Sequence, residues 1–329
     1  MEPNRTGNRK EMVSVPEPTI TALGGGVGAS KLLEGLVRVL PPERLTIVVN
    51  TGDDTVMFGL HISPDIDITL YTLAGMVNRQ TGWGLGGDTF SCLEQLERMG
   101  EPSWFQLGDR DLATHLFRTR RIRAGRTLSE ITEELRQRFG LGCRLLPMSD
   151  DPVPTKIVTD GGVLPFQEYL VKHRAEPRVK EVRFEGVERA RPAPGVVDAI
   201  RESSAVVICP SNPLISIGPI LAVKGVRAAL QSTPARVIAV SPVVGGKSLK
   251  GPTDRMLRDL GLEVSALQVA KLYKDFLNVL VIDHADETIR SEIERMGVQV
   301  VVAQTIMHGA QEKVKLAQVV ISILNEQAA

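Results

Sequence analysis

The chain is poor in aromatic residues, which make up only 4% of its 329 amino acids. Proteins that bind single-stranded RNA or DNA stack the bases on aromatic side chains, so we expect no nucleic-acid partner of this kind. The charges are balanced, with 39 Lys+Arg against 39 Asp+Glu. A chain without net charge has no global electric field to attract nucleic acid or an anionic membrane. Both observations favour a small-molecule ligand.

Cysteines and long apolar runs are also scarce. The three cysteines stand far apart without metal-type spacing, which indicates small buried side chains in a reducing compartment: Cys92, Cys143 and Cys209. No apolar run approaches the roughly 20 residues that span a bilayer, so we expect no membrane partner. Residues 1–18 are polar, contain prolines and lack an apolar stretch, which predicts a disordered tail and not a signal peptide. The sequence therefore predicts a cytoplasmic protein.

Short apolar segments alternate with helical patterns along most of the chain. Continuous apolar strands that alternate with helices indicate a parallel sheet covered on both faces. The predicted strands are residues 20–24, 45–49, 205–209, 236–240, 277–282 and 298–302, with a more polar, edge-like candidate at 180–184. We therefore predict an α/β fold, a Rossmann-like parallel sheet with helices on both faces. Ligands of such sheets bind outside the carboxyl ends of the strands.

The middle of the chain has a different pattern. An amphipathic helix at 128–139 is followed by a segment that prolines interrupt repeatedly. We interpret residues 101–195 as a smaller α+β lobe inserted into a nucleotide- and metal-binding domain of residues 19–100 and 196–329. This lobe contains a basic cluster, for which a solvated surface is favoured over a lip that attracts a phosphorylated ligand: Arg118, Arg120, Arg121, Arg123 and Arg126.

Four carboxylates lie within fifteen residues, directly after the strand at 45–49: Asp53, Asp54, Asp65 and Asp67. Two carboxylates ~4 Å apart repel one another by roughly 4 kcal/mol at a surface-like dielectric. A hard cation removes that cost, and magnesium uses one or two carboxylates together with substrate phosphates. We predict a Mg²⁺ site here, with a solvated acidic turn as the alternative. For Asp65 and Asp67, a structural role is an equal alternative, since Ser63 or Asp65 could cap the helix that runs through Tyr71.

A glycine-rich turn after the strand at 20–24 is a second feature that indicates a phosphate-containing ligand. Glycines allow close approach of the backbone to a ligand, and the amides of a helix N-terminus favour an anion. The spacing also fits a dinucleotide fingerprint, G-x-G-x-x-A, at Gly24, Gly26 and Ala29. However, the second strand is followed by Asn50 and not by the lone acidic residue that would bind a ribose hydroxyl. Nicotinamide binding is therefore disfavoured.

Two later turns repeat this design after buried strands. Residues 210–221 supply hydroxyl, amide and backbone donors suited to a diphosphate or a nucleobase, with helix capping by Ser216 as the alternative. Residues 241–251 offer Lys247 or Lys250 to a phosphate. The five histidines show no metal spacing, and no Ser-His-Asp or Cys-His arrangement can be argued, so covalent nucleophilic catalysis is not supported.

Taken together, these segments resemble the 2-phospho-L-lactate transferase family of deazaflavin biosynthesis. The resemblance covers nearly the whole chain after the N-terminal tail, in one order, and is carried by residues 24–28, 50–54, 63–67, 71–75, 88–90, 107–115, 148–151, 210–221 and 241–251. It implies a Mg²⁺-dependent transferase. Such an enzyme moves the phospholactyl or phosphoenolpyruvyl part of a GDP-activated donor to the ribityl hydroxyl of 7,8-didemethyl-8-hydroxy-5-deazariboflavin (FO). GMP leaves, and the product is coenzyme F(420)-0 or its dehydro form.

On this resemblance we assign roles to residues. The catalytic residues are Asp53, Asp54 and Asp65, of which Asp53 and Asp54 bind Mg²⁺. The nucleotide-binding residues are Gly24, Gly25, Gly26, Gly28, Ser211, Asn212, Ser216, Gly218 and Lys247, and the deazaflavin-binding residues are Asp54, Trp83, Asp88, Thr89 and Asp109. A homodimer is expected. The alternative function is a nucleotide-sugar-binding regulatory protein of the same superfamily, without transfer activity, which a middle lobe lacking a deazaflavin pocket would favour.

Overall fold

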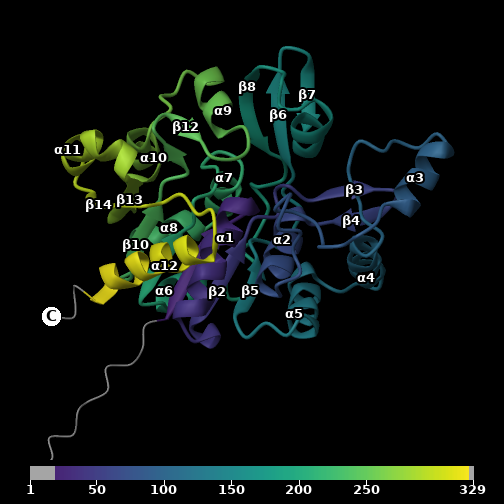
Figure 1. The fold of residues 1–329 in the computed structure, drawn as a ribbon, viewed down its shortest axis with the longest axis horizontal. Coiled ribbons are helices and arrows are strands. Elements are labelled where there is room, and N and C mark those ends of the chain that lie inside the picture. Colours follow the sequence, from purple (N-terminus) through teal and green to yellow (C-terminus); the bar gives the residue numbers. More distant parts are fainter. Residues whose placement is uncertain (1–18, 326–329) are drawn as a thin grey trace, which may run out of the picture.

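A seven-stranded parallel sheet forms the centre of the computed structural model, which describes residues 19–325 (Figure 1). The predicted tail at 1–18 lies outside the described residues. The strand order is β14-β13-β10-β9-β1-β2-β5, and every neighbouring pair is parallel. The strands are β1 (Ile20–Gly24), β2 (Leu45–Val49), β5 (Arg144–Pro147), β9 (Ala205–Ile208), β10 (Arg236–Val240), β13 (Val279–Asp283) and β14 (Gln299–Ala303). The predicted fold class is confirmed.

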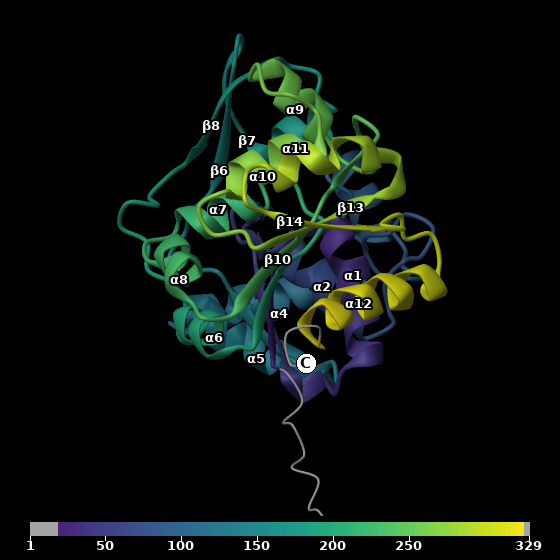
Figure 2. The same cartoon turned by 90° about the vertical axis from the view of Figure 1, so that its left-hand side faces the viewer.

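Helices cover both faces of this sheet, as the two perpendicular views show (Figures 1 and 2). Successive residues of a strand point to opposite faces, so Ala22 and Leu23 of β1 belong to two different core clusters. One face packs against α1 (Gly26–Val39), α2 (Pro64–Leu73), α5 (Leu128–Arg138) and α12 (Ala310–Asn325). The other packs against α6 (Val196–Glu202), α7 (Ile217–Ala222), α8 (Val226–Ser232), α10 (Ala266–Tyr273) and α11 (Arg290–Glu294).

Within the central sheet, β5 is the strand that the sequence pattern did not predict. It lies inside the range 101–195, yet it pairs with β2 in the central sheet, with Arg144 opposite Thr46. Its apolar run is only two residues long, and Pro147 closes it. Proline is tolerated there because β5 is an edge strand with one partner. At least this strand of the predicted lobe therefore belongs to the main sheet.

A separate three-stranded antiparallel sheet follows β5, in the order β7-β6-β8. It consists of β6 (Thr155–Thr159), β7 (Gly162–Pro165) and β8 (Val179–Phe184), with the short π-helix Glu168–Lys172 packed beside it. The polar pattern at 180–184 is explained by this position, because one face of β8 is largely exposed. The domain boundaries proposed from the sequence otherwise remain a prediction.

The remaining elements surround the carboxyl ends of the central strands or project beside them. A hairpin of β3 (Thr55–Met57) and β4 (Leu60–Ile62) lies with α3 (Ser91–Arg98) and α4 (Asp111–Arg123) at one side of the molecule (Figure 1). The small pair β11 (Val243–Val244) and β12 (Lys247–Ser248) precedes α9 (Thr253–Asp259). Short 3₁₀ helices span Pro42–Arg44 and His284–Ile289. Across residues 19–325, no helix combines the length and apolar character needed to cross a membrane.

Candidate functional site

A cavity of about 740 Å³ opens at the carboxyl ends of the central strands, where the turns after β1, β2, β9, β10 and β14 converge. This is the position at which α/β sheets bind ligands. Nine of the residues predicted from the sequence line it: Gly25, Gly26, Gly28, Asp53, Asp65, Trp83, Ser211, Asn212 and Ser216. Seven predicted residues lie elsewhere: Gly24, Asp54, Asp88, Thr89, Asp109, Gly218 and Lys247.

The glycine turn brings the backbone close to two other groups, the Pro210 carbonyl and the Asp65 carboxylate. A Cβ atom on Gly28 would lie 2.2 Å from the Pro210 carbonyl oxygen, and one on Gly25 would lie 2.0 Å from Asp65 Oδ2. Gly26 has a φ of +74°, a left-handed conformation that favours glycine. No side chain caps α1 at Gly25, and its first turn contains no acidic residue. The Gly26 amide interacts with Asp65, and the amides that follow it at the start of α1 lie at the cavity, where they can bind an anion.

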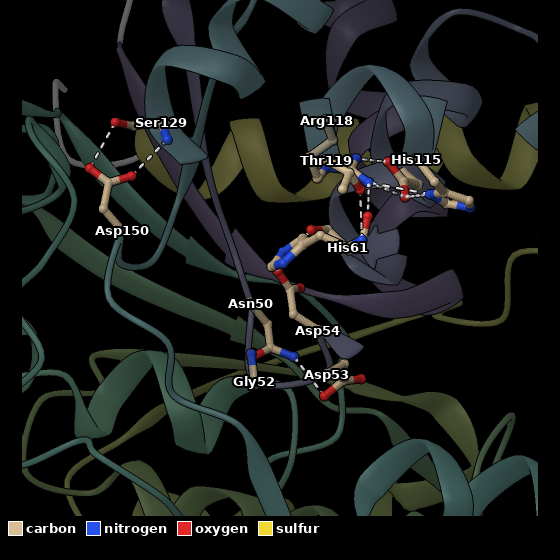
Figure 3. A network of polar contacts seen from close by, with 12 residues as sticks. Asn50, Gly52, Asp53, Asp54, His61, His115, Arg118, Thr119, Ser129 and Asp150 are labelled. Carbon is tan, nitrogen blue, oxygen red and sulfur yellow. Dashed lines mark hydrogen bonds and ion pairs between the residues drawn. The ribbon is translucent and has the colours of Figure 1, made fainter. Parts of the chain in front are cut away.

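Asn50 holds two of the predicted carboxylates beside this turn. Its Nδ2 donates hydrogen bonds to Asp53 Oδ1 at 3.0 Å and to Asp65 Oδ2 at 2.9 Å. Its Oδ1 accepts a hydrogen bond from the Gly52 amide at 2.8 Å, so the side chain is fixed between the turn and the two acids. Figure 3 shows Asn50 with Gly52 and Asp53. All of these side chains are buried. Asn50, whose position after the second strand disfavoured nicotinamide binding, therefore connects Asp53 and Asp65.

Burial and repulsion between the carboxylates raise the free energy needed to ionise Asp53 and Asp65. Burial raises the pKa of Asp65 to about 6, against the opposing hydrogen bond from Asn50. Burial, followed by repulsion from Asp65, raises the pKa of Asp53 well above its ordinary value. Two such carboxylates suit a hard cation. Between residues 19 and 325, no three His, Cys, Asp or Glu side chains form a metal site by themselves. Substrate phosphates and water would have to complete the coordination.

Asp54 faces away from the pair. Its Oδ2 accepts a hydrogen bond from Ser63 Oγ at 2.7 Å and lies 2.9 Å from His61 Nε2 (Figure 3). Its Oδ1 is buried without a partner in the described chain. The structure therefore favours Asp53 with Asp65 at the cavity, and not the predicted pair of Asp53 with Asp54. The alternative of a helix cap is not supported, because no side chain makes a capping hydrogen bond at Ser63, although Asp65 and Asp67 both lie in the first turn of α2.

A buried ion pair lies behind this site, between α2 and α4. The Arg118 guanidinium is fully buried and binds both carboxylate oxygens of Asp67, with Nη1–Oδ2 at 3.1 Å. It also donates to the His61 carbonyl at 3.4 Å, which ties α4 to the β3–β4 hairpin. The side chains of Asp67 and His115 line the cavity in front of it. The surface interpretation of the basic cluster is therefore wrong for Arg118.

The other members of the basic cluster do not reach the cavity. Arg121 pairs with Glu134 at 2.6 Å, Arg126 pairs with Glu130 at 2.8 Å, and Arg123 donates to the Gly59 carbonyl. Arg120 is exposed. These contacts support the interpretation of a surface and structural cluster, and they do not support a ligand-attracting lip.

Comparison with known proteins agrees with this architecture. Residues 20–321 match the family model described as 2-phospho-L-lactate transferase CofD. The chain belongs to the CofD family. It is 40% identical to the 2-phospho-L-lactate transferase of Methanosarcina mazei, over 90% of this chain and 97% of that protein. It is 43% identical to the phosphoenolpyruvate transferase of Streptomyces griseus, over 85% of this chain and 90% of that protein. Family membership makes the chain a transferase.

The fold of the CofD chain is also shared with a solved structure. A UPF0052 family protein from Bacillus halodurans superposes with a TM-score of 0.60 and covers 93% of this chain and 99% of its own. The two sequences are only 16% identical, so this similarity concerns the fold alone.

Three residues of this CofD chain that were predicted to bind the deazaflavin, Asp88, Thr89 and Asp109, make hydrogen bonds at the starts of α3 and α4. Asp88 accepts hydrogen bonds from two backbone amides at the start of α4, and Asp109 accepts two at the start of α3. The Thr89 hydroxyl donates to Asp109 at 2.5 Å. Each aspartate precedes one helix and caps the other, which is a stabilising arrangement at helix N-termini. Of the five predicted deazaflavin residues, Trp83 is the one that lines the cavity.

Two residues predicted to bind the nucleotide, Gly218 and Lys247, lie outside the cavity. Gly218 lies against Phe184, since a Cβ atom there would come within 3.1 Å of that ring. Lys247 is exposed on β12, while Lys250 lines the cavity together with Lys31 of α1. Lys31 escaped prediction because a lone lysine in a helix gives no signal beyond a solvated surface.

The sequence analysis also missed a polar cluster in the cavity, formed by Tyr71, Asp111 and His115. The Tyr71 hydroxyl donates to Asp111 Oδ1 at 2.5 Å, and His115 Nε2 lies 3.4 Å from Asp111 Oδ2. All three side chains line the cavity. Their signal in the sequence is the helical spacing of Asp111 and His115, four residues apart on one face of α4.

The glycine turn yields a prediction that separates stability from chemistry. Gly25→Ala should leave the fold intact but displace the Asp65 carboxylate, because Gly25 has an extended backbone and the obstructing atom ends a side chain. Gly28→Ala should destabilise the protein by about 1–3 kcal/mol, because the obstructing atom is a backbone oxygen. Urea unfolding and transferase assays of both variants would check this. Equal losses of stability in the two variants would contradict it.

Proposed function

We propose that the chain transfers the phospho-carboxylic acid part of a GDP-activated three-carbon acid to the ribityl hydroxyl of FO in coenzyme F(420) biosynthesis. The hydroxyl oxygen forms a bond to the phosphorus that carries the three-carbon acid. The bond from that phosphorus to GMP breaks, GMP leaves, and the hydroxyl proton is released. The names of the relatives support this class of reaction. The observation that carries it is the Asn50-bridged acidic pair beside the α1 amides in one cavity.

Phosphoryl transfer needs mainly positioning and charge stabilisation. In this proposal the amides that follow Gly26 at the start of α1, including that of Gly28, bind the donor diphosphate. Asp53 and Asp65 would hold Mg²⁺, which when bound neutralises charge on the phosphates. A carboxylate of this pair that does not bind Mg²⁺ would instead orient the ribityl hydroxyl and accept its proton, since burial raises its pKa in the metal-free protein.

The apolar part of the cavity supports a planar acceptor. Its lining includes a half-exposed Trp83 and several aromatic and aliphatic side chains: Ile62, Ile68, Tyr71, Phe105, Phe166 and Leu170. Small-molecule sites combine such a surface with a few polar groups that fix orientation. This lining favours the transferase over the alternative, a nucleotide-sugar-binding regulator that needs no deazaflavin site.

The test is incubation of the purified protein with FO, Mg²⁺ and each of three donors, GDP-linked phospholactate, phosphoenolpyruvate or phosphoglycerate. We expect mass spectrometry to detect a new deazaflavin phosphodiester together with GMP, and relative rates to identify the natural donor. No product with any donor, combined with nucleotide-sugar binding, would favour the regulator. A homodimer and a cytoplasmic location remain predictions, which size-exclusion chromatography and cell fractionation would check.

The raised pKa of Asp65 predicts an unusual pH dependence of stability. Its folded-state pKa is about 6 against an ordinary value of 3.8, so the folded protein holds the proton more tightly. The stability that this group contributes is therefore lost as pH rises from about 4 to about 6. Melting temperatures of wild type and Asp65→Asn should diverge across this window, with the variant less sensitive to pH. Mg²⁺ should stabilise the wild type at about pH 7.5 and hardly at about pH 5, where protons compete.

A further inference from the structure

Two lysines, Lys31 and Lys250, line the same cavity as the acidic pair of Asp53 and Asp65. Lys31 projects from the second turn of α1, and its Nζ donates to the Met307 carbonyl at 2.8 Å. Lys250 follows β12, and its Nζ donates to the Thr81 carbonyl at 3.1 Å. Both side chains line the cavity. An ammonium has three N–H donors, so each lysine retains two for a ligand.

Neither lysine is neutralised within the part of the chain that the structure describes. No carboxylate of residues 19–325 forms an ion pair with Lys31 or Lys250. Burial, followed by repulsion from Lys250 and Lys313, lowers the pKa of Lys31. Lys313 itself pairs with Glu34. Two partly uncompensated ammonium groups at one cavity repel each other, and an anionic ligand between them would remove that cost.

The start of α1 lies close to the Lys250 ammonium. A Cβ atom on Gly82 would come within 3.0 Å of Lys250 Nζ and within 3.4 Å of Val27 Cγ1. The loop at Gly82 therefore brings the lysine to the first turn of α1. Lys31 lies on that same helix, so the helix amides and both ammonium groups converge on one region of the cavity. A diphosphate, with its several anionic oxygens, matches this set of donors.

We propose that Lys31 and Lys250, and not Lys247, bind the diphosphate of the guanosine nucleotide together with the amides at the start of α1. This inference rests on the proposed function, because it takes the ligand of the cavity to be a GDP derivative. The donor phosphates would then lie between these lysines and the α1 amides, next to the acidic pair of Asp53 and Asp65.

Calorimetric titration with GDP tests this proposal on the full-length protein. Lys31→Met and Lys250→Met should each weaken GDP binding about tenfold, the usual effect of losing one charged hydrogen bond. Each should also reduce the dependence of affinity on salt concentration. Lys250→Arg keeps the charge on an exposed loop and should bind GDP within about threefold of wild type. The matched control is Lys247→Met, which should bind like wild type because that lysine is exposed outside the cavity.

The possible outcomes distinguish a failure of the lysine assignment from a failure of the proposed function. If wild type binds GDP and the Lys31 and Lys250 variants bind it as tightly as Lys247→Met, the lysine assignment is overturned while the proposed function stands. If wild type binds no GDP, both are overturned. Melting curves of each variant confirm folding, and the exposed Lys250 provides the test even where Lys31→Met disturbs α1.

Discussion

Asp53→Asn is expected to lower turnover by about a thousandfold or more while the protein remains folded. The substitution keeps an oxygen for the Asn50 amide but removes the charge that would hold Mg²⁺ or take the proton of the attacking hydroxyl. Losing several kcal/mol of transition-state stabilisation corresponds to about this factor. Stability should stay constant or increase, because the substitution relieves the repulsion between Asp53 and Asp65. Steady-state assays with FO and a GDP-linked donor, together with melting curves, measure both effects.

Asp54→Asn is the informative comparison. Asp54 is partly buried, but its carboxylate contacts Ser63 and His61 and does not line the cavity. We expect a smaller loss of turnover than in Asp53→Asn or Asp65→Asn. Near-wild-type activity in both of the latter variants would reject the assignment of the acidic pair, and complete loss in Asp54→Asn alone would transfer the metal site to Asp54.

Arg118→Met is expected to destabilise the protein by about 3–5 kcal/mol, because it leaves the buried Asp67 carboxylate without its bidentate partner. The His61 carbonyl loses a donor as well. Because breaking an ion pair costs more than removing both of its members, the double variant Asp67→Asn/Arg118→Met should recover much of that loss. Urea unfolding at equilibrium provides the free energies.

Arg120→Met is the matched control on the same helix. Arg120 is exposed, and substitutions at such sites usually change stability by less than about 0.5 kcal/mol. If Arg118→Met were no more destabilising than this control, the ion pair with Asp67 would have no role in holding α4 against α2.

The central sheet could be predicted from the sequence because each of its inner strands is a continuous apolar run. Strands such as Leu45–Val49 are buried on both faces, and burial on both faces requires that pattern. Edge strand β5 was missed because its apolar run is only two residues long and a proline ends it. The positions of the glycine and acidic turns followed from the fold, since turns after parallel strands meet at one edge of the sheet.

The pairing of individual side chains could not be predicted in the same way. Asp53 and Asp54 are neighbours in sequence, but successive side chains in a turn point in different directions, so Asp53 joins Asp65 and Asp54 joins His61. The burial of Arg118 depends on where α4 packs against α2, which no local pattern encodes. Long-range contacts of this kind decide which charged residue is structural and which faces a ligand.

The crossed capping by Asp88 and Asp109 couples the local unfolding of α3 to that of α4. Each carboxylate stabilises the beginning of the helix that the other one precedes, so α3 cannot unravel from its start without releasing a contact near the start of α4. The two helices should therefore exchange their amide hydrogens as one cooperative unit. Because Asp111 and His115 of α4 line the cavity, the rate of that local unfolding sets how often this wall of the cavity is lost.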